Sequence, residues 1–372
     1  MNEREALAIL VSAQKIGYGQ RQHALDEAGS ALTLLADPHA YAHVLGSTGI
    51  AAIREAMRES GRLLEYLDRT GTKLIAQDDP GYPRLLRGIA HPPHLLFCMG
   101  YEDLSDPFPI AVVGTRRASA YGLRHTHEIS RELVRAGVTV ISGMAAGIDA
   151  ASHKGALEGE GRTVAVLGGA LDKPYPAENR PLMRRIIESG GSVISEYPPG
   201  VAPTRYSFVH RNRIIAGISL GVLVSEAPLK SGAQHTVRMA LDEGREVFAI
   251  PGDIDRPGSQ LPNQLIREGA HMAACAGDIL SELVIEPDRK KEKQQKTADV
   301  PTSQSGQPVQ RPVRRLDAKE QAVYDLLLAG DMDFDALSER TGIASDELGG
   351  LLMMLELDGV VEALPGLAYR LA

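Results

Sequence analysis

The densest group of side chains suited to an anionic polymer lies in the segment RYSFVHRNR. Its candidate ligands are Arg205, Phe208, Arg211 and Arg213. Arginine binds phosphate in bidentate fashion, and an aromatic face stacks on a base. The segment is therefore typical of a site for single-stranded nucleic acid. In the alternative interpretation, Phe208 belongs to the core and the arginines pair with acids such as Glu196 and Glu226.

A second cationic group follows an apolar run in IAVVGTRRASAYG. Here Arg116 and Arg117 come shortly after Gly114, and Ser119 stands ahead of a predicted helix. The loop has neither the G-x-G-x-x-G of a dinucleotide site nor the G-K-[ST] of a P-loop, so no nicotinamide cofactor or ATP is indicated, and no cofactor is expected. A pair of solvated surface arginines is the alternative. Lys230, in KSGAQHT, adds another cation beside a glycine.

Glycines recur where the apolar runs end. Those we expect at the site are Gly114, Gly143, Gly147 and Gly168. Glycine lets backbone N–H groups approach an anion closely, and helix N-termini add partial positive charge. Several such loops on one sheet edge predict an extended, phosphate-bearing ligand.

Residues arranged for catalysis are few. Asp149 and His153 have the spacing of one helix face and are candidates for an acid–base pair, although a structural, hydrogen-bonding histidine is the favoured interpretation. No motif joins a nucleophile to a base, and neither H-E-x-x-H nor C-x-x-C occurs. The sequence therefore predicts neither an enzyme nor a metal site.

Six apolar runs supply the elements that position these groups. They begin at residues 110, 138, 163, 192, 221 and 246, and helical stretches separate them. Continuous apolar runs that alternate with helices are typical of a parallel sheet covered on both faces. We predict an α/β fold with an extended Rossmann-like, doubly wound parallel sheet, whose ligands bind outside the carboxyl ends of the strands.

The rest of the chain suggests three further parts. Residues 1–70 predict a small helical domain, SAM-like or helix-hairpin-helix-like, with helix breaks at Gly17 and Gly19. The α/β domain spans 71–285. Residues 286–315 lack Leu, Ile, Phe and Tyr and predict a flexible linker. Residues 316–372 predict a winged helix, with helices at 318–329, 334–341 and 346–357 followed by a hairpin.

Composition limits the function classes. The chain has 40 basic and 48 acidic residues, which argues against coating nucleic acid with the whole surface. Residues 316–372 hold 3 basic and 12 acidic residues, so this winged helix is not expected to bind DNA. The two cysteines fit a reducing cytosol, and no apolar run is long enough for a membrane span. We therefore expect a cytoplasmic protein.

Across about residues 75–285, the chain resembles the DNA-processing protein A family, also called Smf. The resemblance is carried by VVGTRRASAYG, SGMAAGIDAASHKGAL, AVLGGALDKPYP, ISEYPPG, FVHRNRIIAG, KSG, VFAIPG and NQLIREGA, which match the family in order and spacing. The resemblance implies a non-enzymatic protein that binds incoming single-stranded DNA during natural transformation. It also implies loading of the RecA recombinase, displacement of single-strand-binding protein and strand annealing.

The resemblance also implies which positions act. The family's DNA-binding positions fall on Arg116, Arg205, Phe208, Arg211 and Lys230 of this sequence. Its homodimer surface falls near residues 263–272, where the apolar candidates are Leu265, Ile266 and Met272.

This chain departs from the family pattern at three places. Many relatives have S-G-[ST]-L-I-T where Ser231–Thr236 stand here, and many have a basic residue at the position of Ala177. Gln260-Leu261-Pro262 replaces the usual serine-glycine.

The rival interpretation is an enzyme, a phosphoribohydrolase of the lysine-decarboxylase-like family. That family has P-G-G-x-G-T-x-x-E, and this chain has Pro251-Gly252-Asp253-Ile254-Asp255 instead.

Overall fold

The computed structural model describes residues 1–283, 318–328, 330–343, 348, 351–352, 355, 360–364 and 368–371. The chain divides into two compact units, one N-terminal and one C-terminal, and each is described by itself. The expected linker at 286–315 lies outside the described residues, as does most of the expected helix at 346–357.

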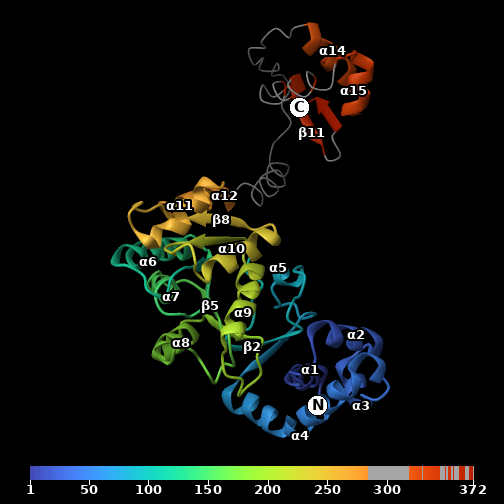
Figure 1. Cartoon of the computed structure of the whole chain (residues 1–372), viewed down its shortest axis with the longest axis vertical. Helices are drawn as coiled ribbons and strands as arrows, with labels where there is room; N and C mark the ends of the chain where they lie inside the picture. Colours follow the sequence, from blue (N-terminus) through green and yellow to red (C-terminus); the bar gives the residue numbers. More distant parts are fainter. Residues whose placement is uncertain are drawn as a thin grey trace, which may run out of the picture. The chain divides into compact units, whose positions relative to one another are not determined.

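A long sheet forms the centre of the N-terminal unit (Figure 1). Its strands are β1 (Lys73–Ala76), β2 (Leu95–Gly100), β3 (Pro109–Val113), β4 (Thr139–Ser142), β5 (Thr163–Val166), β6 (Ser192–Ser195), β7 (Gly221–Val224), β8 (Glu246–Ala249) and β9 (His271–Met272). In the described part of this unit, their order is β1-β2-β6-β5-β4-β3-β7-β8-β9. All neighbours from β6 to β9 pair in parallel, and all six predicted strands are confirmed. The antiparallel edge made by β1 and β2 was not expected.

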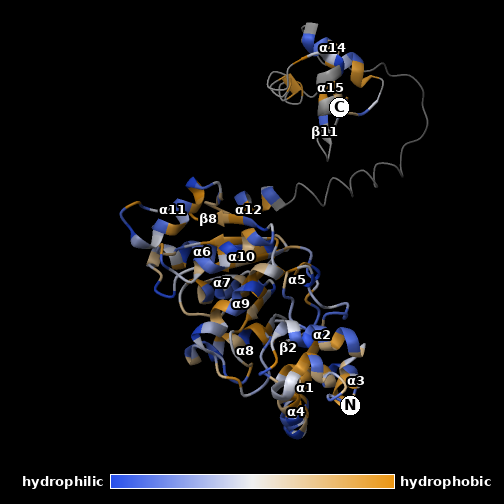
Figure 2. Cartoon of the chain, turned by 45° about the vertical axis from the view of Figure 1, so that its right-hand side comes forward, coloured by the Kyte–Doolittle hydropathy of each residue, from blue (hydrophilic) through white to orange (hydrophobic). Residues whose placement is uncertain are grey.

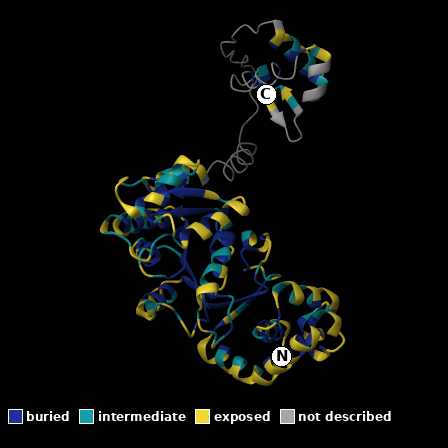
Figure 3. Cartoon of the chain, viewed as in Figure 1, coloured by how far each residue is buried: buried dark blue, intermediate teal, exposed yellow. Residues whose placement is uncertain are grey.

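Helices cover both faces of this sheet, as a doubly wound fold requires. They are α5 (Arg84–Arg87), α6 (Ala120–Arg135), α7 (Ile148–Glu158), α8 (Arg180–Glu188), α9 (Arg205–Ile218), α10 (Ala233–Asp242), α11 (Gln260–Arg267) and α12 (Ala276–Leu283). Along β3, Ala111 and Val113 face α9 and α10, whereas Ile110 and Val112 face α6 and α12. The middle positions of strands β3 to β8 are therefore apolar on both faces, and Figures 2 and 3 show these strands as largely hydrophobic and buried.

The N-terminal helices pack on one end of this unit. They are α1 (Glu3–Ser12), α2 (Tyr18–Ala28), α3 (Ala31–Ala36) and α4 (Ala42–Thr70), the last interrupted at Gly46. Gly17 does separate α1 from α2, because its N–H donates to the side chain of Gln20 at the start of α2. The predicted break at Gly19 was wrong, since Gly19 lies within α2.

The C-terminal unit has the elements of a winged helix. Its described elements are α14 (Ala318–Leu327), β10 (Met332–Asp333), α15 (Phe334–Thr341), β11 (Val361–Leu364) and β12 (Ala368–Leu371). The strands form an antiparallel sheet of order β10-β12-β11. Val323, Leu337 and Val361 meet in its core.

Candidate nucleic-acid interface

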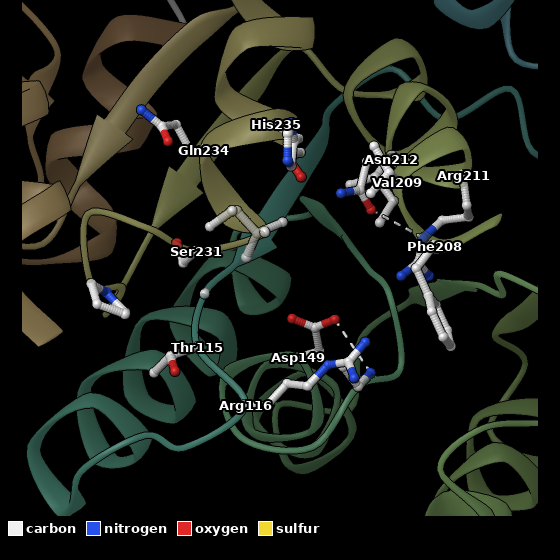
Figure 4. A pocket seen from close by; sticks show the side chains of 18 of the residues that line it. Thr115, Arg116, Asp149, Phe208, Val209, Arg211, Asn212, Ser231, Gln234 and His235 are labelled. Atoms are coloured by element: carbon white, nitrogen blue, oxygen red, sulfur yellow. Dashed lines mark hydrogen bonds between the residues drawn. The ribbon is translucent and has the colours of Figure 1, made fainter. Parts of the chain in front are cut away.

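A cavity opens where the strand order of the large sheet reverses. At this point β3 and β7 lie side by side, and the helices that follow them, α6 and α10, cover opposite faces. The cavity holds about 850 Å³ (Figure 4). It is lined by Val113–Arg117, Ala145, Asp149, residues of α9 between Arg205 and Ile215, Pro228 and Lys230–Thr236. We call this cavity and its lining the switch-point groove.

Four exposed cations line the switch-point groove. They are Arg116, Arg117, Arg205 and Lys230. They come from the loop after β3, the first turn of α9 and the loop after β7, so the fold brings together three distant segments. Within the described residues, none of the four forms an ion pair with an acid. Uncompensated cations in a concave site raise the local concentration of an anionic ligand.

Arg211 lines the groove but is buried, and its guanidinium holds the protein together. Its Nη1 donates to the carbonyl oxygen of Gly143 at 2.8 Å and to that of Val166, which ties the ends of β4 and β5 together. Burial lowers the pKa of Arg211 to about 10, and the nearby carboxylate of Asp149 opposes this shift. The expected direct phosphate contact is therefore corrected, because this guanidinium is already bound by carbonyl oxygens.

Arg213 also has a partner inside the protein. Its Nη2 lies 2.6 Å from Oε1 of Glu196, and both side chains are largely buried. The structure thus favours the alternative interpretation for Arg213, which does not line the groove. Glu226 accepts a hydrogen bond from the backbone N–H of Ser119 at 2.7 Å rather than pairing with an arginine.

Phe208 lies at the wall of the groove and is half-buried. Beneath the ring is Gly168, where an added Cβ would stand 2.6 Å from Cδ1 of Phe208. The guanidinium carbon of Arg116 lies over the ring, 5.0 Å from its centroid and within the range of a cation–π contact. Gly168 therefore makes room for the ring rather than contacting a ligand.

The other strand-end glycines also make room for protein atoms. A Cβ on Gly143 would stand 2.5 Å from Nη2 of Arg211, and one on Gly114 would stand 2.6 Å from Cγ1 of Ile148. Gly147 has φ +79°, and its missing Cβ admits the backbone of Thr115 and Arg116. These protein contacts explain the missing Cβ atoms without a ligand. Phosphate binding by the N–H groups of these glycines stays a prediction, and Gly114 does line the groove. Ser119, outside the groove, caps α6 by accepting from the N–H of Gly122.

The Asp149–His153 pair is separated by its surroundings. Asp149 lies at the floor of the groove, where its Oδ2 accepts from the N–H of Ala145 at 3.3 Å, and burial raises its pKa. His153 is fully buried outside the groove, with Nδ1 2.8 Å from the hydroxyl oxygen of Thr163, and burial lowers its pKa to about 3. A neutral histidine fixed in this way is structural, in agreement with the favoured interpretation.

Several polar residues of the groove were not proposed as ligands from the sequence, and two of them, Gln234 and His235, depart from the family pattern. Gln234 and His235 stand on the first turn of α10, across the cavity from Arg116 (Figure 4). Their signal was the departure of this segment from the family pattern. Both carry hydrogen-bonding groups at the positions where many relatives have leucine and isoleucine.

The three expected dimer residues differ in accessibility. Leu265 is buried in the core of its own unit, so it is not available to a second chain, and its assignment to an interface is corrected. Ile266 packs partly against the same core. Met272 is 56% exposed on the edge strand β9.

Among the described residues, no group of three His, Cys, Asp or Glu side chains is placed to hold a metal ion. No helix in that part of the chain is both long and apolar enough to cross a membrane.

Comparison with known proteins agrees with this architecture. Residues 73–284 match the family model of DNA recombination-mediator protein A, and residues 307–366 match that of the DprA winged helix domain. The chain is 38% identical to Protein Smf of Escherichia coli K12 over 346 residues, covering 90% of this chain and 88% of that protein. It is 38% identical to the DNA processing protein DprA of Bacillus subtilis strain 168, covering 60% of this chain and 75% of the relative.

Two solved structures are similar as well. The DNA processing protein A of Streptococcus pneumoniae aligns with a TM-score of 0.64 at 34% identity, covering 75% of this chain and 97% of that one. DNA processing protein A of Helicobacter pylori, described for its single-stranded DNA binding mode, aligns with a TM-score of 0.52 at 27% identity, covering 58% and 98%. By its matched domains and its full-length relatives, this chain belongs to the DNA recombination-mediator protein A family.

Proposed function

We propose that the switch-point groove binds single-stranded DNA. The observation that carries this proposal is the convergence of four exposed, unpaired cations from three segments beside an aromatic wall. Cations track a phosphate backbone, and aromatic faces accept unstacked bases of any sequence. The Helicobacter pylori relative, described by its binding of single-stranded DNA, supports the same ligand.

The concave form of the site favours a single strand over a duplex. Phe208 stands on the wall of a cavity, which only a base freed from its stack can enter. Of the candidate residues, the site is composed of Gly114, Arg116, Arg205, Phe208 and Lys230, with Arg211 acting as its structural support.

The bound strand is handed on rather than altered. Asp149, the carboxylate that lines the groove among the described residues, accepts from the backbone N–H of Ala145, and His153, one turn along α7, is buried outside the groove. We infer a non-enzymatic recombination mediator that accepts incoming DNA in natural transformation, loads RecA onto it in place of single-strand-binding protein and promotes annealing. A cytoplasmic homodimer formed through the β9 edge would carry two such grooves.

The phosphoribohydrolase alternative is disfavoured by the loop after β8. At Gly252, the N–H donates to Oδ1 of Asn263 at 3.1 Å, and the carbonyl oxygen accepts from Nδ2 at 2.9 Å. The backbone that would have to hold a phosphoribosyl group is thus already bridged by a side chain.

The test compares single- and double-stranded oligonucleotides of one sequence by fluorescence anisotropy. The parent is expected to bind the single strand more tightly, and the double variant Arg116→Ala/Lys230→Ala to lose most of this binding. A matched control is Lys73→Ala/Arg135→Ala, which removes the same charge from exposed positions at the opposite edge of the sheet. Equal losses in both double variants would show that net charge, and not the groove, binds DNA.

A further inference from the structure

An exposed tyrosine stands just outside the switch-point groove. Tyr175 lies in the loop between β5 and α8, and its side chain is 50% exposed. Its ring centroid is 5.5 Å from that of Phe208, with the two ring planes inclined at 50°. An aromatic side chain of this exposure beside a cationic groove leaves an apolar face in water, which a partner would cover.

The surroundings of Phe208 make Tyr175 the more accessible ring of the pair. Phe208 is half-buried, because the backbone of Gly168 lies against it and the Arg116 guanidinium lies over it. Tyr175 therefore offers a larger exposed fraction to a base that enters from solvent than Phe208 does.

Arg116 connects this ring to the phosphate-binding cations. Its guanidinium carbon lies 5.9 Å from the centroid of Tyr175 and 5.0 Å from that of Phe208. A phosphate held by this guanidinium has its own base one sugar away, within reach of the tyrosine face. Phosphate contact and base stacking are thus available to one nucleotide at adjacent side chains.

We propose that Tyr175 is a base-stacking platform that extends the strand-binding site from the switch-point groove toward the carboxyl end of β5, with Phe208 as its support. The proposal rests on the single-strand binding proposed above. It names the second chemical element of that site, the π-face of a phenol ring, and its ligand, an unstacked nucleobase of any sequence.

The first test uses fluorescence. The chain contains no tryptophan, so Tyr175→Trp introduces a unique indole into the full chain. Titration with oligo-dT is expected to quench its emission at the concentrations at which anisotropy reports binding. The matched control is Tyr101→Trp. Tyr101 is 51% exposed, and the guanidinium carbon of Arg162 lies 4.6 Å from its ring centroid, so its surroundings resemble those of Tyr175. It differs in position, because it follows β2 at the opposite edge of the sheet. Quenching equal to that of the control would overturn the proposal.

The second test uses affinity. Tyr175→Ala is expected to weaken oligo-dT binding about tenfold with an unchanged salt slope, because stacking releases no counterions. Tyr175→Phe keeps the ring and is expected to bind like the parent. An alanine variant that binds like the parent, or a phenylalanine variant as weak as the alanine one, would overturn the proposal. If Arg116→Ala/Lys230→Ala loses binding but Tyr175→Ala does not, the stacking role of Tyr175 is rejected and the strand-binding groove is kept. If the parent binds no single strand, both proposals are rejected.

Discussion

The salt dependence of binding gives the sharpest test of which cations contact DNA. The structure separates the arginines and the lysine into two groups. Arg116, Arg117, Arg205 and Lys230 are exposed in the groove, whereas Arg211 donates to carbonyl oxygens. Only the exposed group can exchange counterions for phosphates. The slope of log affinity against log salt should therefore report the number of cations in the exposed group.

The magnitude follows from the number of exposed cations. Each phosphate contact of a single strand contributes about 0.7 to the slope, so four contacts give about −2.8. Between 50 and 200 mM salt, the affinity of the parent should then fall by about 50-fold. Arg116→Ala/Lys230→Ala leaves two contacts and a slope of about −1.4, which corresponds to a loss of only about sevenfold over the same range.

The assay is fluorescence anisotropy of labelled oligo-dT at four or more salt concentrations, with circular dichroism to confirm that each variant is folded. The control Lys73→Ala/Arg135→Ala should keep the slope of the parent. A folded groove variant with the parent's slope would refute the assignment of Arg116 and Lys230 to phosphates. A slope that falls equally in the control would refute the localisation of binding to this edge of the sheet.

Four further outcomes are expected. Arg211→Ala should lower the free energy of unfolding by about 3 kcal/mol or more in chemical denaturation, because it leaves two buried carbonyl oxygens without their donor; a marginal change would show that this arginine is not structural. Burial lowers the pKa of folded His153 to about 3, so the unfolded chain takes up a proton at this histidine first as the pH falls below 6.5. Between about pH 6.5 and pH 3, this uptake lowers the free energy of unfolding by up to about 1.4 kcal/mol per pH unit. His153→Asn should therefore flatten the pH dependence of the denaturation midpoint in this range. Met272→Glu places a charge on the exposed edge strand and should convert the proposed homodimer to monomers in light scattering; a variant that stays dimeric would place the interface elsewhere, and a monomeric parent would reject the dimer. Removal of residues 316–372, with their 12 acidic and 3 basic residues, should leave single-strand affinity within about twofold at physiological salt, whereas a large loss would assign DNA contacts to the winged helix.

The parallel part of the sheet was predictable because strands β3 to β8 are buried on both faces and are therefore apolar at their middle positions. Strand β2 carried the same kind of apolar signal in LLFCMG. The only described helix between β1 and β2 is the four-residue α5, which is too short for the helix of a crossover unit. The two-residue strand β9 is too short to form a pattern. The local sequence pattern therefore identified the parallel strands at the centre of the sheet. The pairing of the edge strands β1, β2 and β9 depended on tertiary contacts, which the local pattern does not show.

The site was predictable by residue type but not by role. Arginine at positions 205, 211 and 213 is the same signal in sequence, yet α9 directs the three side chains to a groove, to strand-end carbonyls and to Glu196. Helix periodicity predicts that the three side chains point in different directions. It does not predict which of them faces the groove until the position of the sheet relative to α9 is known. Tyr175 was missed as a ligand because one tyrosine with a single neighbouring cation, Lys173, does not distinguish a binding loop from a solvated one.

The strand-end glycines explain how loops can hold the groove's cations in place. In nucleotide-binding enzymes, such glycines admit a phosphate to the backbone N–H groups. Here Gly143 admits the guanidinium of Arg211, Gly168 admits the ring of Phe208, and Gly147 admits the backbone that carries Arg116. Each loop is thereby packed against its neighbour, and the exposed cations start from a rigid base, which reduces the ordering cost of binding. The space beside Gly143 is thus filled by a guanidinium of the protein, and we expect anion binding at the exposed side chains rather than at backbone amides. A surface of this kind suits a long polymer held by several weak contacts better than one tightly bound nucleotide.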